Sequence, residues 1–318
     1  MVKNEKIARA IFAKCLQLQK GECCLIISDE NRRAFAQMLF TSIHKYGCNP
    51  VLAEVMSPKR YGDEPPKALI EAMRHADAVI LTTEFPLIHR QVRVTGFKTR
   101  ILTISTIDTN TIERLISADY SKIKERTQKM ADIFTIGKRL TITTPAGTNL
   151  TMSIANVKGK VNSGVATDKG QFSSLPGGEA YLSPVSGSAQ GKVVIDRSLD
   201  FIGLLNEPLT LSVKDGVIVK ISGNKEAQNF RRIIKPYGQN ARKLIGVGVG
   251  TNDRAKPGLS VGEDKKSIGT VHITIGNNTF YDKTRRLPAR IDGVLQNASL
   301  SIDGRQIIKH GEIPIFHP

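Results

Sequence analysis

Three side chains in the second half of the sequence, Glu179, His272 and Asp292, are of the types that bind metal ions or move protons. Glu179 follows two glycines, and His272 lies three residues after Gly269. Glycines let a backbone approach a ligand closely, and a histidine with carboxylates suits zinc, iron, manganese or cobalt. Their spacing is not local, so the sequence leaves open whether the three side chains converge. A lone histidine in a strand is more often a core or surface residue than a ligand.

Two further segments carry candidate polar groups. Lys265 and Lys266 follow Glu263-Asp264 shortly before the histidine segment, where they could lie near a substrate. The interpretation favoured by the residues themselves is a solvated helix start. Tyr181, two residues after Glu179, could donate a proton, although a tyrosine in a β domain is usually a packing residue.

The elements that must position these residues change character along the chain. Apolar residues with helical spacing alternate with short apolar runs, and such alternation predicts a doubly wound parallel sheet. We expect helices at 4–19, 31–46, 65–75 and 84–97, and strands at 23–27, 50–55, 78–83 and 100–104.

The second half is predicted to be mainly β. Two helices are expected within 110–137, and β patterns with many glycines follow them. Hairpins are predicted at 209–221 and 299–308, where Asp-Gly turns join two apolar strands. Another strand pair is expected at 138–154 and a helix at 224–235. The sequence therefore predicts an α/β domain at 1–137 and a mainly β (α+β) domain at 138–318 that carries the candidate site.

Composition argues against several classes of protein. No apolar run reaches the roughly 20 residues of a membrane-spanning helix, and the charged N-terminus lacks the pattern of a signal peptide, so we expect a cytoplasmic protein. The net charge of +17 suggests nucleic-acid binding, but the basic residues are scattered and aromatic residues make up only 5% of the chain. A basic surface equally attracts small anions. The four cysteines lie within the first 48 residues and form no CxxC pair, which favours buried reduced thiols.

The segments around the candidate residues resemble a known family. Gly178-Glu179 is followed by Tyr181 and Pro184-Val185, and Gly248-Val-Gly250-Thr-Asn252 and Gly269-Thr-Val-His272 come later in the same order. This order resembles the thermophilic metallo-aminopeptidases, the aminopeptidase T and aminopeptidase S group, and their shorter relatives, the iron-dependent 2,5-dihydroxypyridine dioxygenases. The resemblance covers residues 140–312 and implies a metallo-aminopeptidase type of C-terminal domain. It also implies a homodimer and a ligand site in a cleft between the two domains.

The resemblance assigns metal-binding positions to Glu179, His272 and Asp292, but two expected ligands are replaced. Gly246 stands where aminopeptidases carry a metal-binding glutamate, and Arg290 stands where the family has the histidine of a His-x-Asp pair. Glycine offers no ligand atom, and arginine stays cationic without a lone pair to give. The charge of Arg290 would lie close to the position of the metal ion. Two unit charges about 4 Å apart repel by roughly 4 kcal/mol at an effective dielectric near 20, and the repulsion between Arg290 and a divalent ion would be about twice that.

Three hypotheses remain open. In the favoured one the metal site is degenerate and metal-free, Arg290 pairs with the carboxylates, and the protein binds or acts on a small, anionic molecule with weak or no ordinary aminopeptidase activity. Glu179, His272 and Arg290 are then the expected catalytic residues, and Arg290, Lys266 and Tyr181 the expected substrate-binding ones. In the second, one divalent metal stays on Glu179, His272 and Asp292 and supports a hydrolase or a ring-cleaving dioxygenase. In the third, the protein binds a ligand or partner without catalysis.

Overall fold

The chain forms two compact units. The structure is a computed structural model that describes residues 2–57, 65–83, 98–104, 111–112, 114, 117–276 and 290–316. Unit 1 comprises Met1–Lys124 and Asn162–Gly177, and unit 2 comprises Glu125–Val161 and Gly178–Pro318. The domain boundary expected at residue 137 stays a prediction. The compact units divide the chain 13 residues earlier, between Lys124 and Glu125, and unit 1 also includes the later segment Asn162–Gly177.

Unit 1 is built on a parallel sheet with the strand order β2-β1-β3-β4-β8. The central strand β1 pairs in parallel with β2 on one side and with β3 on the other. The strands are β1 (Cys23–Asp29), β2 (Asn49–Val55), β3 (Ala78–Thr82), β4 (Arg100–Thr103) and β8 (Phe172–Ser174). The first four occur where the apolar runs predicted them. Strand β8 was not predicted, because its sequence Phe-Ser-Ser has no extended apolar run.

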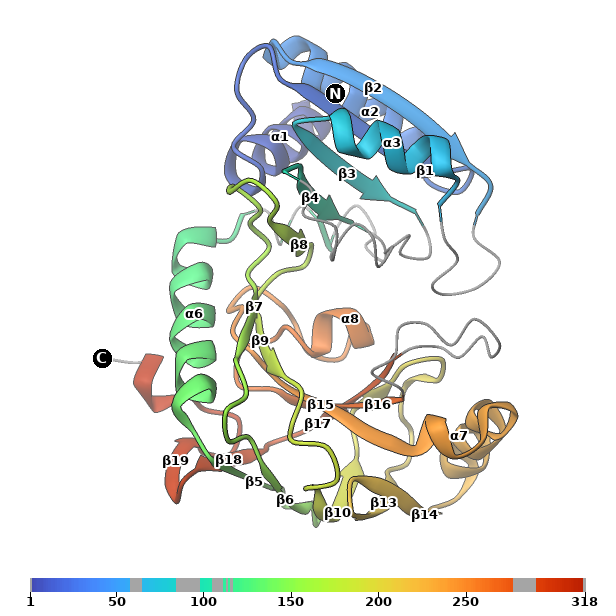
Figure 1. Ribbon diagram of the computed structural model, residues 1–318, viewed down its shortest axis with the longest axis vertical. Helices are drawn as coiled ribbons and strands as arrows, with labels where there is room; N and C mark the ends of the chain where they lie inside the picture. The colour runs from blue at the N-terminus through green and yellow to red at the C-terminus, as the bar shows by residue number, and fades with distance from the viewer. Residues whose placement is uncertain are drawn as a thin grey trace. The chain divides into compact units, whose positions relative to one another are not determined.

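Helices cover both faces of this sheet. In both cartoon views α1 and α2 lie on one face and α3 on the other (Figure 1). The helices are α1 (Val2–Ala10), followed by a π-helical turn at Ile11–Cys15, then α2 (Arg33–Tyr46) and α3 (Lys67–His75). Helix α2 buries Ala36, Leu39 and Ile43, a stripe with helical spacing, and ends at Gly47, whose left-handed φ of 93° suits glycine.

Unit 2 is dominated by antiparallel strands. Its sheet runs in the order β12-β11-β17-β16-β15-β14-β13-β10-β6-β5-β18-β19, with β9 pairing with β15 and β7 with β9. The longer strands are β5 (Arg139–Thr143), β6 (Asn149–Ser153), β10 (Gln190–Ile195), β13 (Leu209–Lys214), β14 (Val217–Ser222), β15 (Lys243–Gly250), β16 (Val271–Gly276), β17 (Arg290–Leu295), β18 (Ser299–Ile302) and β19 (Arg305–Ile308). The short ones are β7 (Lys160–Asn162), β9 (Glu179–Leu182), β11 (Ser198–Leu199) and β12 (Gly203–Leu204). The helices are α6 (Tyr120–Ile136), whose first five residues belong to unit 1, α7 (Lys225–Ile234) and α8 (Val261–Asp264).

The expected fold class is confirmed. The predicted strand pairs β5–β6, β13–β14 and β18–β19 all form as antiparallel pairs. The helix expected at 84–97 and part of the first helix expected after residue 110 lie outside the described residues. No helix of the described part of the chain is long and apolar enough to span a membrane.

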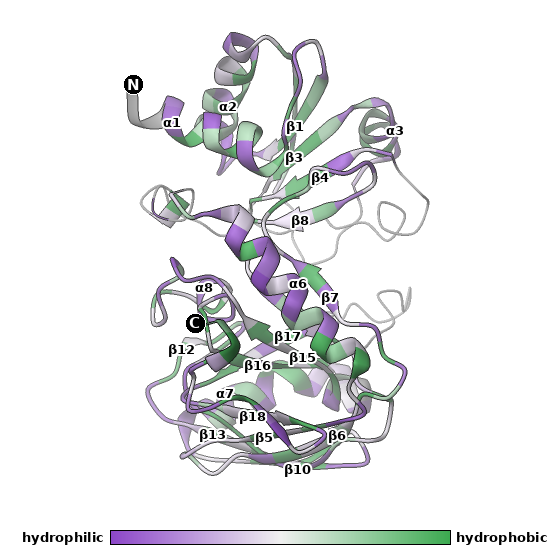
Figure 2. Cartoon of the chain, turned by 90° about the vertical axis from the view of Figure 1, so that its left-hand side faces the viewer, coloured by the Kyte–Doolittle hydropathy of each residue, from purple (hydrophilic) through white to green (hydrophobic). Residues whose placement is uncertain are grey.

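Each unit buries its own hydrophobic core. In unit 1 apolar residues of β1, β3 and α3 pack together, while a larger cluster in unit 2 joins α6 and α7 to the antiparallel strands. The hydropathy colouring shows the same pattern, with green strands in the sheets and alternating purple and green along α6 (Figure 2). The unit 2 core fixes the strands on which the candidate residues stand.

Candidate active site

Four neighbouring strands of unit 2 present the candidate residues on one face. In the order β9-β15-β16-β17, Tyr181 pairs with Gly248 and Gly248 with His272, while Thr274 pairs with Asp292. Directly paired residues share a face of a sheet, and so do residues two apart on one strand. Glu179, two residues before Tyr181, and Arg290, two residues before Asp292, therefore belong to the same face.

Glycines on β15 make room for this cluster. A β-carbon at Gly248 would overlap the imidazole carbon Cε1 of His272, and one at Gly246 would lie 2.8 Å from Oγ1 of Thr274. A β-carbon at Gly250 would collide with the backbone oxygen of Ser267. The glycines expected to admit a ligand thus admit side chains and a loop of the protein itself.

The segment after α8 supplies two ammonium groups. Asn252 N donates to the backbone oxygen of Lys266 (2.9 Å), and Gly269 N donates to that of Gly250 (3.0 Å). These bonds hold the segment against the end of β15. Lys266 is 3% exposed, and Glu263 and Asp264 are buried as well, so the interpretation of this stretch as a solvated helix start is wrong. Helix α8 lies above β15, β16 and β17 in both cartoons (Figure 1).

Both carboxylates of the cluster are paired with lysines. Nζ of Lys265 lies 2.5 Å from Oδ2 of Asp292, and Nζ of Lys266 is in contact with Oε2 of Glu179. Thr274 donates from Oγ1 to Oδ1 of Asp292 (2.7 Å), and Arg290 donates from Nη2 to the same hydroxyl (3.2 Å). Burial raises the pKa of Asp292, but the positive charges of Lys265 and Arg290 outweigh burial and hold that pKa well below its ordinary value.

The His272 imidazole is fully buried and lacks a hydrogen-bond partner among the described residues. Its Nε2 atom lies 2.9 Å from Oε1 of Glu179, but the alignment does not make a hydrogen bond, and Nδ1 also has none. Burial lowers the pKa of His272 to about 3, against an opposing effect of Asp292, so the ring is neutral near neutral pH. A neutral imidazole offers one N–H donor and one lone pair, and buried polar atoms without partners call for one.

Asp200 adds a third carboxylate behind Asp292. Its Oδ2 atom accepts a hydrogen bond from Asp292 N (2.7 Å). Burial, and then the charge of Asp292, raise the pKa of Asp200 to about 6. Burial also lowers the pKa of Lys266 to about 7, whereas its contact with the Glu179 carboxylate acts in the opposite direction and favours the ammonium form. Low dielectric surroundings thus shift several groups of one cluster, a pattern that is common at functional sites.

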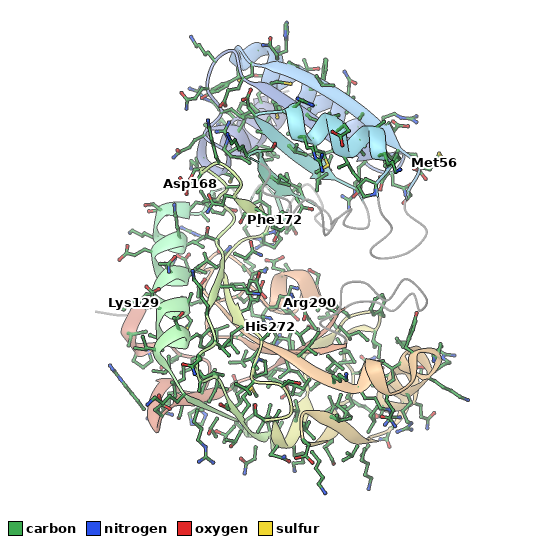
Figure 3. All side chains as sticks on the ribbon, viewed as in Figure 1. Met56, Lys129, Asp168, Phe172, His272 and Arg290 are labelled. Carbon is green, nitrogen blue, oxygen red and sulfur yellow. The ribbon has the colours of Figure 1, made fainter. Side chains whose placement is uncertain are left out.

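The rim of the site is partly open to solvent. Arg290 and Tyr181 are half-buried, and the Arg290 guanidinium lies over the Tyr181 ring, 5.6 Å from its centroid. Figure 3 labels His272 and Arg290 in the same region of unit 2, on the strands beneath α8. Arg290 and Tyr181 are therefore partly accessible to solvent, unlike His272, which is fully buried.

The residues assigned to the site from the sequence thus all belong to this neighbourhood, and two further members were missed. Thr274 and Asp200 were not considered, whereas Lys265 was named together with Lys266 as a group that could lie near a substrate. Thr274 could have been found, since it lies two residues after His272 and therefore shares its face. Asp200 follows a two-residue strand and carries no pattern in the sequence.

The fold and the site define a class of protein with a parallel α/β unit and an antiparallel unit that carries a buried acid–base cluster. The sequence profile of the 2,5-dihydroxypyridine 5,6-dioxygenase (NicX) family matches residues 5–314, and the chain belongs to that family. It is 23% identical over 257 residues to the 2,5-dihydroxypyridine 5,6-dioxygenase of Pseudomonas putida, covering 76% of this chain and 72% of that protein.

Two solved structures share the fold. The structure of 2,5-dihydroxypyridine dioxygenase from Pseudomonas putida KT2440 superposes with a TM-score of 0.85 at 18% identity, covering 98% of this chain and 97% of that one. Wild-type AmpT from Thermus thermophilus superposes with a TM-score of 0.67 at 14% identity, covering 98% and 99%. Both likenesses concern the fold. They confirm the two sides of the resemblance drawn from the sequence motifs.

An iron ion, which that resemblance implies, does not fit the side chains as they are arranged. Lysine ammonium groups occupy one oxygen of Glu179 and one of Asp292, and Thr274 occupies the other oxygen of Asp292. The common iron(II) site of non-haem oxygenases uses two histidines and a carboxylate, and the described residues of this cluster include one histidine, His272. Within the part of the chain that the structure describes, no three His, Cys, Asp or Glu side chains are placed to share one ion.

Proposed function

We propose that the protein binds and acts on a small hydroxylated aromatic molecule, with the site on the β9-β15-β16-β17 face of unit 2. The observation that carries the proposal is the His272 imidazole, which is buried, neutral and without a hydrogen-bond partner among the described residues. A ring hydroxyl can donate to the free nitrogen or accept from the N–H. Glu179, beside that imidazole, is placed to hold the proton of such a hydroxyl.

The cations around this imidazole favour a ligand with negative charge. Lys266 lies on the Glu179 side of the cluster and Arg290 on the Asp292 side, where its guanidinium covers Tyr181. An ionised hydroxyl or a ring carboxylate would meet these groups, and a planar ring can pack against a tyrosine face. Lys266, Arg290 and Tyr181 are therefore the proposed substrate-binding residues, and Glu179 and His272 the proposed proton-handling pair.

Membership of the NicX family supports a ring substrate over a peptide. The relatives of that family are named as dioxygenases of a dihydroxypyridine, so a dihydroxylated aromatic ring is the substrate class that this membership favours. A two-metal peptidase needs bridging carboxylates that hold both ions and activate a water. With Gly246 and Arg290 at two of those positions, we propose weak or no ordinary aminopeptidase activity.

Binding without turnover is the second candidate function. The ion pairs of Lys265 and Lys266 favour it, because they hold both carboxylates in a fixed arrangement that forms without substrate. Such a protein would bind the ring ligand and release it unchanged.

Absorbance, oxygen uptake and calorimetric binding with 2,5-dihydroxypyridine and other hydroxylated pyridines and benzenes test the proposal. Leucine p-nitroanilide serves as the peptidase substrate in parallel. The expected result is binding of one ring compound per chain, weakened by Lys266→Met and unchanged by Lys309→Met, a matched substitution of an exposed lysine on unit 2. Consumption of the ring compound separates catalysis from binding alone. Hydrolysis of the anilide with no binding of any ring compound would overturn the proposal.

A further inference from the structure

The two replaced positions in the motif pattern lie next to each other in space. Gly246 on β15 pairs with Thr274 on β16, and Thr274 pairs with Asp292 on β17, so the three form one row across the sheet. Arg290 reaches this row through its hydrogen bond to Thr274 Oγ1 (3.2 Å). The losses of a glutamate and of a histidine therefore concern a single small region.

Because Gly246 has no side chain, there is room for Thr274 to form its hydrogen bonds with Asp292 and Arg290. A β-carbon there would lie 2.8 Å from Thr274 Oγ1, tighter than an ordinary contact, and a longer acidic side chain would compete for the same hydroxyl. Thr274 uses that hydroxyl to hold Asp292 (2.7 Å) and to receive Arg290. Glycine at 246 and arginine at 290 are thus compatible with each other, and each removes one metal ligand.

Basic side chains of the protein supply the positive charge next to these carboxylates. Lys265 lies on Asp292 at 2.5 Å, Lys266 is in contact with Glu179, and Arg290 is joined to Asp292 through Thr274. Asp292 and Lys266 are 3% exposed, so these charges meet in a largely dry region where pairing matters most. With Asp200 included, the described residues of the cluster comprise three carboxylates and three basic side chains, so the charges of these residues balance.

A divalent ion added to this cluster would leave an excess of two positive charges beside two ammonium groups and a guanidinium. Removing an ammonium to make room would leave a buried carboxylate without its partner. Arginine binds carboxylates and other oxyanions through planar, fixed N–H donors and stays charged, so it can replace a metal cation next to them.

We infer that Lys265, Lys266 and Arg290 take the place of a metal ion in this chain, so that the site binds its anionic ligand through side-chain cations alone. The inference deepens the proposed function, because it names the charges that meet the ligand. It is tested separately, on the protein without any ring compound.

Metal content and metal titration are the direct test. Protein purified without a metal-affinity tag is analysed for bound metals, then titrated with Fe²⁺, Mn²⁺, Co²⁺ and Zn²⁺ while heat of binding and melting temperature are recorded. Wild type is compared with the double variant Arg290→His/Lys265→Ala, which restores a histidine and removes one ammonium. Arg305→His/Lys309→Ala, at exposed positions of β19 and the turn after it, is the control.

The inference predicts no bound metal and no saturable binding in wild type and control, and at least about tenfold tighter binding in the double variant. One metal per chain in wild type, or equal affinity in wild type and double variant, would overturn it. If the double variant does not fold, the wild-type metal content and the single variant Arg290→His still decide the matter. A wild type that binds both metal and ring compound overturns this inference alone, whereas one that binds neither overturns the proposed function alone.

Discussion

At the scale of single residues, the site depends on groups that leave space as much as on groups that react. Gly248 is the clearest case, because the His272 ring occupies the volume of its missing side chain. A β-carbon at Gly248 would lie within 2.5 Å of both Cε1 and Nε2 of this ring, and the ring itself is fully buried. The position of the imidazole, and thus its alignment with Glu179, is fixed by a residue with no chemistry of its own.

The substitution Gly248→Ala should therefore displace His272 and weaken ring-ligand binding, while lowering the free energy of unfolding by about 1–3 kcal/mol through overpacking. Chemical denaturation and calorimetric titration measure the two effects. Gly304→Ala is the control, since a β-carbon there meets nothing within 4 Å and only its left-handed φ of 80° is strained. Equal ligand affinity in Gly248→Ala and wild type would show that the ring is not held there.

Burial of a neutral His272 predicts a specific dependence of stability on pH. The pKa of this group is about 3 in the folded chain and 6.5 as its ordinary value. Between these pH values the unfolded chain takes up a proton that the folded chain refuses, so stability falls as the pH drops from 6.5 towards 3. The slope is at most roughly 1.4 kcal/mol per pH unit for one proton.

The variant His272→Gln should lose this part of the slope. Denaturation of wild type and variant at several pH values from 7 down to the acid limit of reversible unfolding measures the difference, in which the carboxylates common to both proteins cancel. The same slope in both proteins would mean that His272 is protonated in the folded state.

At the scale of elements, helix α8 places the ammonium groups, and its anchors lie outside the site. Asp264, the last residue of α8, accepts hydrogen bonds from Ser198 Oγ (2.7 Å) and Gly258 N (2.5 Å). Ser260 caps the start of the helix by accepting from Glu263 N (3.2 Å). The positions of Lys265 and Lys266 therefore depend on the hydrogen bonds that Asp264 and Ser260 make just before them in the chain.

Replacing Asp264 by Asn should loosen this anchor, because the amide has one acceptor where the carboxylate uses two. We expect a loss of about 1–3 kcal/mol in unfolding free energy and weaker ligand binding. Asp253→Asn is the control: its carboxylate pairs with Arg126 at 2.7 Å but is 48% exposed, so less than about 1 kcal/mol should be lost. Unchanged ligand affinity in Asp264→Asn would show that the anchoring of α8 does not affect ligand binding.

Most strands of unit 1 and three strand pairs of unit 2 could be predicted from the sequence, whereas the other strands of unit 2 were expected only as a general β pattern and the contents of the site could be predicted only in part. Apolar runs such as Cys23–Ile27 and Asp-Gly turns such as Asp215-Gly216 are local signals, and the expected strands and hairpins formed there. Strand β8 was missed because pairing with β4, far away in the sequence, decides its conformation. Lys266 was expected to be solvated, since burial of a lysine depends on a partner such as Glu179 that no local pattern reveals.

At the scale of the whole molecule, the excess of positive charge bears on how a ligand arrives. The net charge of +17 attracts anions over distances at which salt screens the attraction. Association of an ionised ring compound should therefore slow as salt rises, while that of an uncharged analogue should not. Stopped-flow binding at low and high salt measures this effect. Equal salt dependence for both compounds would show that the net charge does not affect the association rate.

The homodimer and the cytoplasmic location stay predictions from the sequence, and so does the domain boundary at residue 137. Family membership and fold are shown over nearly the whole chain, by the profile match at residues 5–314 and by the TM-score of 0.85. The peptidase side of the resemblance is supported at the level of fold, with a TM-score of 0.67. The dioxygenase side is supported by sequence as well, and it sets the substrate class proposed for the site.

The central claim is that unit 2 binds a small ring anion through His272 and side-chain cations. Its most direct test is a calorimetric titration of the full chain with 2,5-dihydroxypyridine, with and without a strong chelator. The account predicts one site per chain, the same affinity in both conditions, and binding weakened about tenfold or more in His272→Gln and Lys266→Met. Binding that needs an added metal, or that survives both substitutions unchanged, would contradict it.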